Sequence, residues 1–155
     1  MGDEESRFIR ICEAGTDDEP VENIKLEPDK VYDVYVLFDN SSENGIAKDV
    51  NVQVDISKEI HSIFATIRSS NTNPEKIVSK ITLDYDEHNY ELVYFKDNIK
   101  FVSDWPINGT SIDHKKIFGK DGTLIGVRKP DGRLPAGVEY SGYIVFQIGI
   151  TPCKI

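Results

Sequence analysis

The stretch from residue 31 to residue 56 constrains the fold of this chain most, because it reads as two β-strands joined by a polar loop. In its second half, Val50, Val52, Val54 and Ile56 alternate with polar residues. Successive side chains of a strand point to opposite faces, so one face of this strand must lie in a core and the other in water. The pattern predicts an antiparallel sheet with one solvated face.

Similar short apolar runs, separated by turn residues, recur along the rest of the chain. Glycine follows Asn or Asp at several of the breaks, Asp121-Gly122 among them, as tight turns require. The segment 74–81 starts with Pro and Glu and suits one or two helical turns as well as a strand. We therefore predict an all-β fold, an immunoglobulin-like antiparallel β-sandwich of about nine or ten strands, with residues 1–155 as one domain. The predicted strands are 7–12, 24–26, 31–38, 47–56, 60–68, 77–85, 90–95, 99–102, 123–127 and 140–150.

The charge of the chain excludes some classes of partner. A net charge of −9 argues against nucleic-acid backbones and anionic membranes, which need Lys and Arg to displace counterions. Apolar runs stay well below the roughly 20 residues of a membrane span, so we expect no membrane insertion by this segment. Cys12 and Cys153 lie near the two ends of the chain. They are either a disulfide between the first and last strands or two unpaired thiols.

Three short motifs resemble a known class of domain. A strand ending in Asn40-Ser41-Ser42 precedes the strand that starts with Ala47 to Val52, and Pro135 to Val145 leads into the last strand. In these features the chain resembles bacterial extracellular β-sandwich modules of the DUF11- and CARDB-like class of surface-protein domains. The resemblance covers most of the chain and implies a module of an envelope protein, with signal peptide and anchor elsewhere in a parent protein.

The resemblance implies a non-enzymatic function. We expect a structural, spacer or adhesive role in an extracellular or cell-envelope location, with other domains of the parent protein, an extracellular protein or a glycan as partner. A carbohydrate-binding or calcium-assisted ligand-binding module is the alternative. A hydrolase with a dispersed carboxylate site is a third class, although the sequence holds no Gly-x-Ser-x-Gly elbow and no Cys-His signature.

One acidic loop is the candidate metal site. Ca²⁺ takes six to eight oxygen ligands, and a loop rich in carboxylates can wrap the ion. Asp17, Asp18 and Glu19 stand together in such a loop, and the alternative is a solvated acidic surface. The run that begins with Asp84 lacks the glycine of an EF-hand, and the three histidines lack the spacing of a zinc site.

The region around the single tryptophan is the candidate ligand site. Trp105 stands beside Asp104 and close to Asn108 in a long irregular segment. An exposed indole there would stack on a sugar ring while the two polar side chains hold its hydroxyl groups. Alternatively, the indole fills the space between the two sheets, as large aromatics do in sandwich cores.

Overall fold

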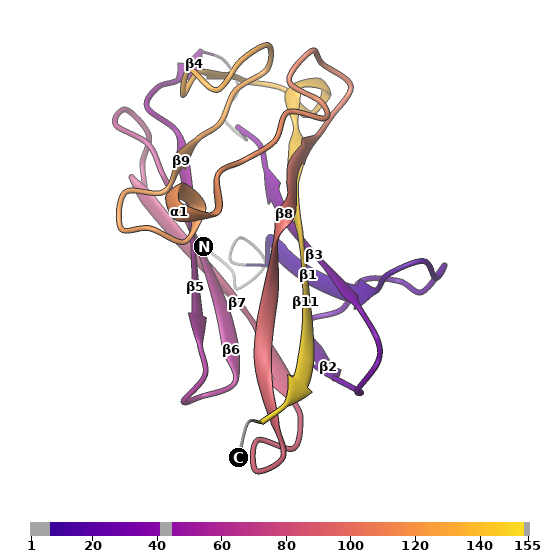
Figure 1. Cartoon of the computed structure of the whole chain (residues 1–155). Coiled ribbons are helices and arrows are strands. Elements are labelled where there is room, and N and C mark those ends of the chain that lie inside the picture. The colour runs from indigo at the N-terminus through magenta and orange to yellow at the C-terminus, as the bar shows by residue number, and fades with distance from the viewer. Residues whose placement is uncertain (1–6, 41–44, 154–155) are drawn as a thin grey trace.

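The computed structural model describes residues 7–40 and 45–153. Two β-sheets pack face to face around one hydrophobic core, so the all-β sandwich is confirmed (Figure 1). The first sheet has the order β1-β3-β11-β8, formed by β1 (Ile9–Glu13), β3 (Tyr32–Phe38), β11 (Gly142–Pro152) and β8 (Tyr90–Val102). The second has the order β2-β7-β6-β5-β9, formed by β2 (Asn23–Lys25), β7 (Lys76–Asp84), β6 (Ser62–Arg68), β5 (Asn51–Ser57) and β9 (Thr123–Leu124).

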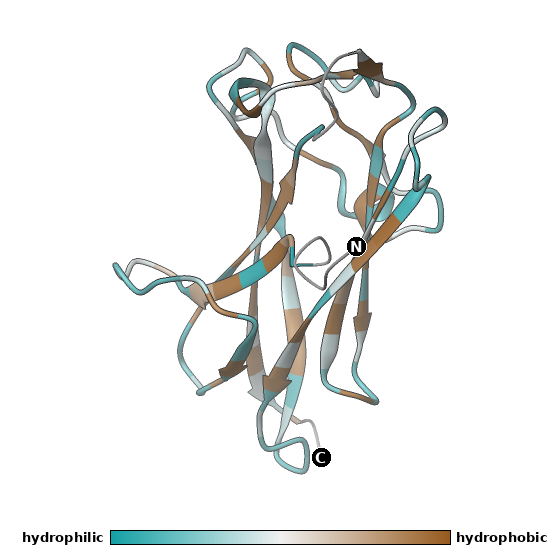
Figure 2. Cartoon of the chain, turned by 180° about the vertical axis from the view of Figure 1, so that it is seen from behind, coloured by the Kyte–Doolittle hydropathy of each residue, from teal (hydrophilic) through white to brown (hydrophobic). Residues whose placement is uncertain are grey.

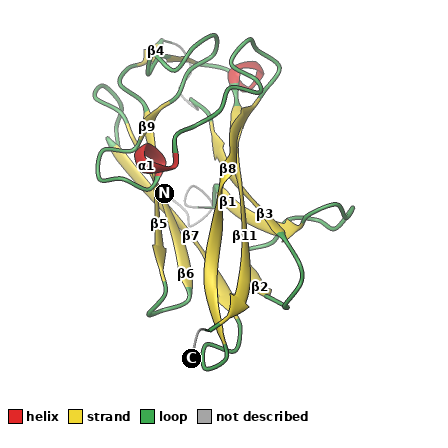
Figure 3. Ribbon diagram, viewed as in Figure 1, coloured by secondary structure: helices red, strands yellow, loops and turns green. Residues whose placement is uncertain are grey.

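Few elements lie outside the two sheets. A two-stranded ribbon pairs β4 (Ile46–Ala47) with β10 (Leu134–Pro135). Helical structure in the described part of the chain is limited to α1 (His114–Ile117) and a 3₁₀ turn at Val138–Tyr140, both in the loop-rich half of the molecule (Figure 3). No helix among the described residues is long and apolar enough to cross a membrane.

The predicted alternation is confirmed in the strands that suggested it. Burial alternates residue by residue along β3, and Val52 and Val54 of β5 are fully buried while Asp55 is exposed. Apolar and polar residues accordingly alternate along the strands (Figure 2). The inward side chains of both sheets form the core, whose largest fully buried members include Phe38, Phe101 and Phe146. Burial of this apolar surface is the main force that holds the sheets together.

The segment 74–81 is not helical. From Lys76 onward it belongs to β7, which pairs with β6 from Arg68↔Lys76 to Ser62↔Thr82. Exposed and buried residues alternate along β7, so this segment has the period of a strand. Pairing across the sheet therefore decides the structure of a segment whose first residues suit a helix start.

Two other features differ from the expected sheets. β2 runs parallel to β7, whereas the other strand pairs are antiparallel. In addition, β8 is continuous from Tyr90 to Val102, although the sequence predicted two separate runs. The polar break in the sequence coincides with a register shift in the neighbouring strand, between Val145 and Gln147. A bulge of this kind lets the ladder continue across an irregular stretch.

Cys12 and Cys153 are both free thiols. Cys12 is paired across the ladder with Asp33, and Asp33 with Gln147, so β3 separates the two cysteine-bearing ends. Cys153 also lies six residues beyond Gln147, which corresponds to about 20 Å along an extended strand. A disulfide requires Cα atoms within about 7 Å, and the register therefore keeps these thiols apart.

Candidate functional site

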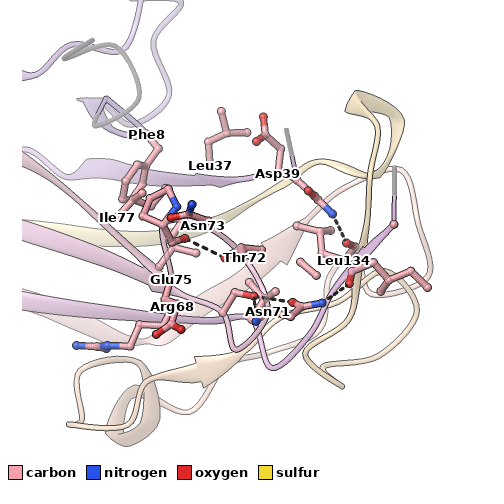
Figure 4. A pocket seen from close by; sticks show the side chains of 18 of the residues that line it. Phe8, Leu37, Asp39, Arg68, Asn71, Thr72, Asn73, Glu75, Ile77 and Leu134 are labelled. Carbon is pink, nitrogen blue, oxygen red and sulfur yellow. Dashed lines mark hydrogen bonds between the residues drawn. The ribbon is translucent and has the colours of Figure 1, made fainter. Parts of the chain in front are cut away.

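A cleft of about 680 Å³ opens where the β1–β3 side of the first sheet meets the start of β7 in the second. We call it the seam cleft (Figure 4). Its walls come from segments that are distant in the sequence: the start of β1, the end of β3, the β4–β10 ribbon, the end of β6 and the loop from Ser69 to Glu75. The lining includes Phe8, Leu37, Asp39, Ile67, Arg68, Ser69, Asn71, Thr72, Asn73, Glu75, Ile77 and Leu134.

The floor of the seam cleft is apolar. Phe8 and Leu134 are buried, while Leu37, Ile67 and Ile77 are half-buried and pack against the core. The backbone N–H of Leu37 donates to the carbonyl of Phe8 at 2.8 Å, so strand pairing fixes these two side chains relative to each other. A rigid apolar hollow of this size is suited to hold an apolar group of a partner.

Hydrogen bonds tie the loop that borders the cleft to the ribbon strand opposite. The side-chain amide of Asn71 donates to the carbonyl of Ile46 at 2.9 Å, and its oxygen accepts the backbone N–H of Lys48 at 2.7 Å. The hydroxyl of Ser69 donates to the carbonyl of Lys48 at 3.0 Å. Because these bonds bridge residues that are distant in the sequence, the cleft is shaped before any ligand enters. The Asn73–Pro74 peptide bond in this loop is cis.

The polar groups at the rim carry charges of both signs. Asp39 and Glu75 are exposed, and the Arg68 guanidinium, which is half-buried, donates to the side-chain oxygen of Gln53 at 2.8 Å. The two hydroxyl side chains on the rim already donate to backbone carbonyls, Ser69 to Lys48 and Thr72 to Pro74. This lining offers apolar contact and hydrogen bonds, the usual composition of a binding site.

Trp105 lies at a junction of loops, and its side chain is half-buried. Its ring stacks on Tyr140, with centroids 5.1 Å apart and planes inclined by 25°. The indole N–H donates to the carbonyl of Glu139 at 2.7 Å, and the guanidinium carbon of Arg128 lies 6.0 Å from the ring centroid. The indole therefore contacts three loops at the edge of the core. Its half-buried position lies between the two arrangements that the sequence suggested, an exposed indole and an indole packed between the sheets.

The two polar neighbours of Trp105 have different surroundings. Asp104 is exposed. The side-chain oxygen of Asn108 accepts the backbone N–H of Ser103 at 3.0 Å, and the backbone N–H of Asn108 donates to the carbonyl of Trp105 at 2.9 Å. Asn108 thus closes the turn that carries the indole. Sugar binding by Trp105, Asp104 and Asn108 stays a prediction.

Asp17, Asp18 and Glu19 are exposed in the loop between β1 and β2, which projects from the flank of the sandwich (Figure 1). Within residues 7–40 and 45–153, no group of three or more His, Cys, Asp or Glu side chains gathers into a metal site. Calcium binding by this loop stays a prediction. The loop and Trp105 occupy separate parts of the fold, so the fold does not combine them into one site.

In a second acidic stretch, the carboxylates of Asp86 and Glu87 make contacts with nearby side chains and backbone groups. The carboxylate oxygens of Asp86 accept the backbone N–H of His88 at 3.1 Å and the side-chain amide of Asn89 at 2.7 Å. The Asn89 bond, with the backbone bonds, lowers the pKa of Asp86. Nearby, Glu87 contacts the Nε2 atom of His61 at 2.8 Å. These contacts close the turn between β7 and β8.

The sequence did not single out the seam cleft. Its residues belong to five separate segments, and each segment reads as an ordinary strand or turn. One signal was visible: Leu37 is apolar at a position where strict alternation along β3 would place a polar side chain. Comparisons with family models, with curated proteins and with solved structures yield no match. The likeness to surface-protein modules therefore rests on the short sequence motifs alone.

Proposed function

We propose that this domain is a non-catalytic, immunoglobulin-like binding module of an extracellular or cell-envelope protein, and that it holds its partner in the seam cleft. The observation that carries the proposal is the combination of an apolar floor with a rim fixed by hydrogen bonds across the fold. In such a cleft an apolar group of the partner loses contact with water, while rim groups set its orientation.

A spacer or adhesive role agrees with the way the site is built. The cleft is bordered by loops and strand ends, whereas the core lies between the sheets. A sandwich holds such loops rigidly and leaves their sequence free to suit a partner. The extracellular location is proposed from the resemblance to surface-protein modules, and the partner would be another domain or an extracellular protein.

The test is a binding screen read at single residues. The ¹⁵N-labelled domain is titrated with short peptides, glycans and Ca²⁺, and backbone amide shifts are recorded. We expect at least one ligand class to shift amides around Phe8, Leu37, Thr72 and Ile77. Thr72→Trp, which places a large side chain at the cleft, should abolish that response. Thr16→Trp, in the exposed β1–β2 loop, is the matched control and should leave it unchanged.

The outcome separates the candidate sites. Saturable shifts confined to the loop of Trp105 would move the binding function to that loop and contradict the proposal. Shifts confined to Asp17, Asp18 and Glu19 on addition of Ca²⁺ would do the same for the acidic loop. A ligand at about 100 times its dissociation constant adds about 2.7 kcal/mol to the free energy of unfolding, so thermal unfolding gives an independent check.

A further inference from the structure

One edge of β7 carries backbone N–H and C=O groups that no other described strand pairs with, and this free edge borders the seam cleft. We propose that the partner of this domain is an extended peptide that adds to β7 as a further strand, with acidic side chains on its outer face and apolar side chains directed inward. This inference rests on the proposed function, because it assigns the chemical class of the partner held beside the seam cleft.

Hydrogen bonding along β7 shows which backbone groups face the free edge. The N–H of Leu83 donates to the carbonyl of His61, and the carbonyl of Glu75 accepts the N–H of Ser69, so odd-numbered residues bond toward β6 at both ends. The N–H of Thr82 instead donates to Glu22, on the β2 side. Backbone groups alternate along a strand, and those of Lys76, Val78 and Lys80 therefore point to the free edge.

β2 covers only the last part of this edge. It pairs with Thr82, Leu83 and Asp84, and the chain that precedes it lies against β1, where Val21 pairs with Ile11. Among residues 7–40 and 45–153, no strand pairs with the β2-facing side of β7 from Lys76 to Ile81. An unpaired row of N–H and C=O groups is a template for a further strand.

Two hollows border this edge, and β1 also comes close to β7 there. The seam cleft lies beside Ile77, and a second hollow of about 320 Å³ lies beside Val78, Ser79 and Lys80. Arg7, at the start of β1, lines both hollows. A peptide along the edge would place its inward side chains next to the apolar floor of the seam cleft.

The side chains of β7 determine the chemistry of the partner. Lys76, Val78 and Lys80 are exposed on the outer face, and Ile77 and Ile81 point toward the core. Residues directly opposite on a neighbouring strand share a face, so a partner strand fits best with acid, apolar, acid on its outer face. Lys76 and Lys80 would give the acidic side chains of such a strand complementary charge, while Arg7, beside the same edge, is paired with Glu22.

The same charges oppose a second copy of this chain as the occupant. Antiparallel pairing of two β7 edges around Val78 would place Lys76 of one copy opposite Lys80 of the other. Like charges directly opposite each other on neighbouring strands are destabilising, and edge lysines are a common protection against such pairing. A separate acidic peptide would form hydrogen bonds with the backbone groups of this edge without this repulsion.

The experiment uses the full chain and the synthetic peptide Gly-Glu-Ile-Val-Ile-Glu-Gly, with Gly-Lys-Ile-Val-Ile-Lys-Gly as its charge-reversed control. Amide hydrogen exchange is measured with and without peptide. We expect the amides of Val78 and Lys80 to exchange rapidly in the free protein and to become protected by the first peptide. The amides of Ile77, Ser79 and Ile81, which bond to β6, should be protected in both states.

Two kinds of substitution separate the contribution of backbone hydrogen bonds to peptide binding from the contribution of charge. Val78→Pro removes an N–H that β6 does not use, and it should abolish peptide binding, whereas Val78→Ala should retain it. In the double variant Lys76→Glu, Lys80→Glu, affinity for the acidic peptide should fall about tenfold and affinity for the basic control should rise. This exchange of preference also tests the proposal if the proline variant does not fold.

Three results would overturn the inference. Protection of Val78 and Lys80 in the monomeric free protein would show that the chain covers its own edge. Protection that appears only with dimer formation would assign the edge to a second copy. Peptide binding that leaves both amides unprotected would remove strand addition as the mode of binding. If ligands still shift the amides of Leu37 and Thr72 in that last case, the seam cleft keeps its proposed function.

Discussion

Gly15 and Gly122 are both in a backbone conformation that favours glycine, but only at Gly122 is space for a side chain also lacking. Both have positive φ, +78° and +70°, a region that favours glycine. A Cβ atom at Gly15 would meet nothing within 4 Å, whereas at Gly122 it would lie 2.6 Å from the carbonyl oxygen of Val52. The Asp121-Gly122 dipeptide predicted a turn, but the close approach to β5 is a property of the folded molecule.

These two glycines give a matched pair of substitutions. Gly15→Ala incurs only the backbone cost of positive φ and should lower the free energy of unfolding by about 1–2 kcal/mol. Gly122→Ala also forces a methyl group against the Val52 backbone and should lower it by about 2–4 kcal/mol. Urea denaturation of both variants measures the difference. Equal losses would mean that the loop at Gly122 moves away from β5 without cost.

At the scale of elements, the two edges of β7 have different environments. One edge is paired with β6 from Lys76 to Thr82, and the other is paired with β2 only near its end. Lys76 and Lys80 stand on the outer face of the unpaired part. Charged side chains at a free edge discourage association between identical chains.

Removal of these charges should therefore cause self-association. In the double variant Lys76→Val, Lys80→Val, the outer face of the free edge becomes apolar at positions 76, 78 and 80, and we expect dimers or larger species at concentrations where the parent chain is monomeric. Sedimentation velocity over a range of concentrations measures this. The control Lys58→Val, Lys129→Val makes the same change in charge at exposed turn positions. Association of the control to the same extent would attribute the effect to net charge alone.

At the scale of the whole molecule, the strand order decides the state of the two thiols. Cys12 is 6% exposed, and burial raises the pKa of its thiol, although a hydrogen bond with Tyr35 acts in the opposite direction. Cys153 is half-buried beyond the end of β11. Because the thiolate is the reactive form, both burial and the raised pKa slow the reaction of Cys12.

Timed alkylation with iodoacetamide, followed by mass spectrometry, should find one fast thiol and one slow thiol. Cys153 should react first in the native protein, and Cys12 should react at a comparable rate only in denaturant. Because its pKa is raised, Cys12 should remain slow as the pH increases past the ordinary range of a thiol. The absence of reaction at both cysteines until a reductant is added would show a disulfide and would contradict the register of β1, β3 and β11.

The class of fold and several strands followed from local pattern. Alternation in residues 50–56 predicted a strand with one buried face, and the turn at Asp121-Gly122 followed from the backbone freedom of glycine. These properties depend on neighbours in the sequence, so the chain itself carries them. The segment 74–81 was ambiguous for the same reason, since its local signals suited both a helix start and a strand.

The sites depended on contacts between distant segments. Phe8, Leu37, Thr72 and Ile77 form one cleft because the register of two sheets brings three separate segments of the chain together, and no local pattern encodes that register. The free edge of β7 exists because β2 pairs with only three of its residues, and the chain just before β2 pairs with β1 instead. By itself the sequence determined the all-β class and, in the clearly alternating strands such as β3 and β5, which face is buried, since both follow from local periodicity. Only the tertiary structure decided which strand edges stay unpaired and which side chains meet, because pairing partners are chosen by packing across the whole core.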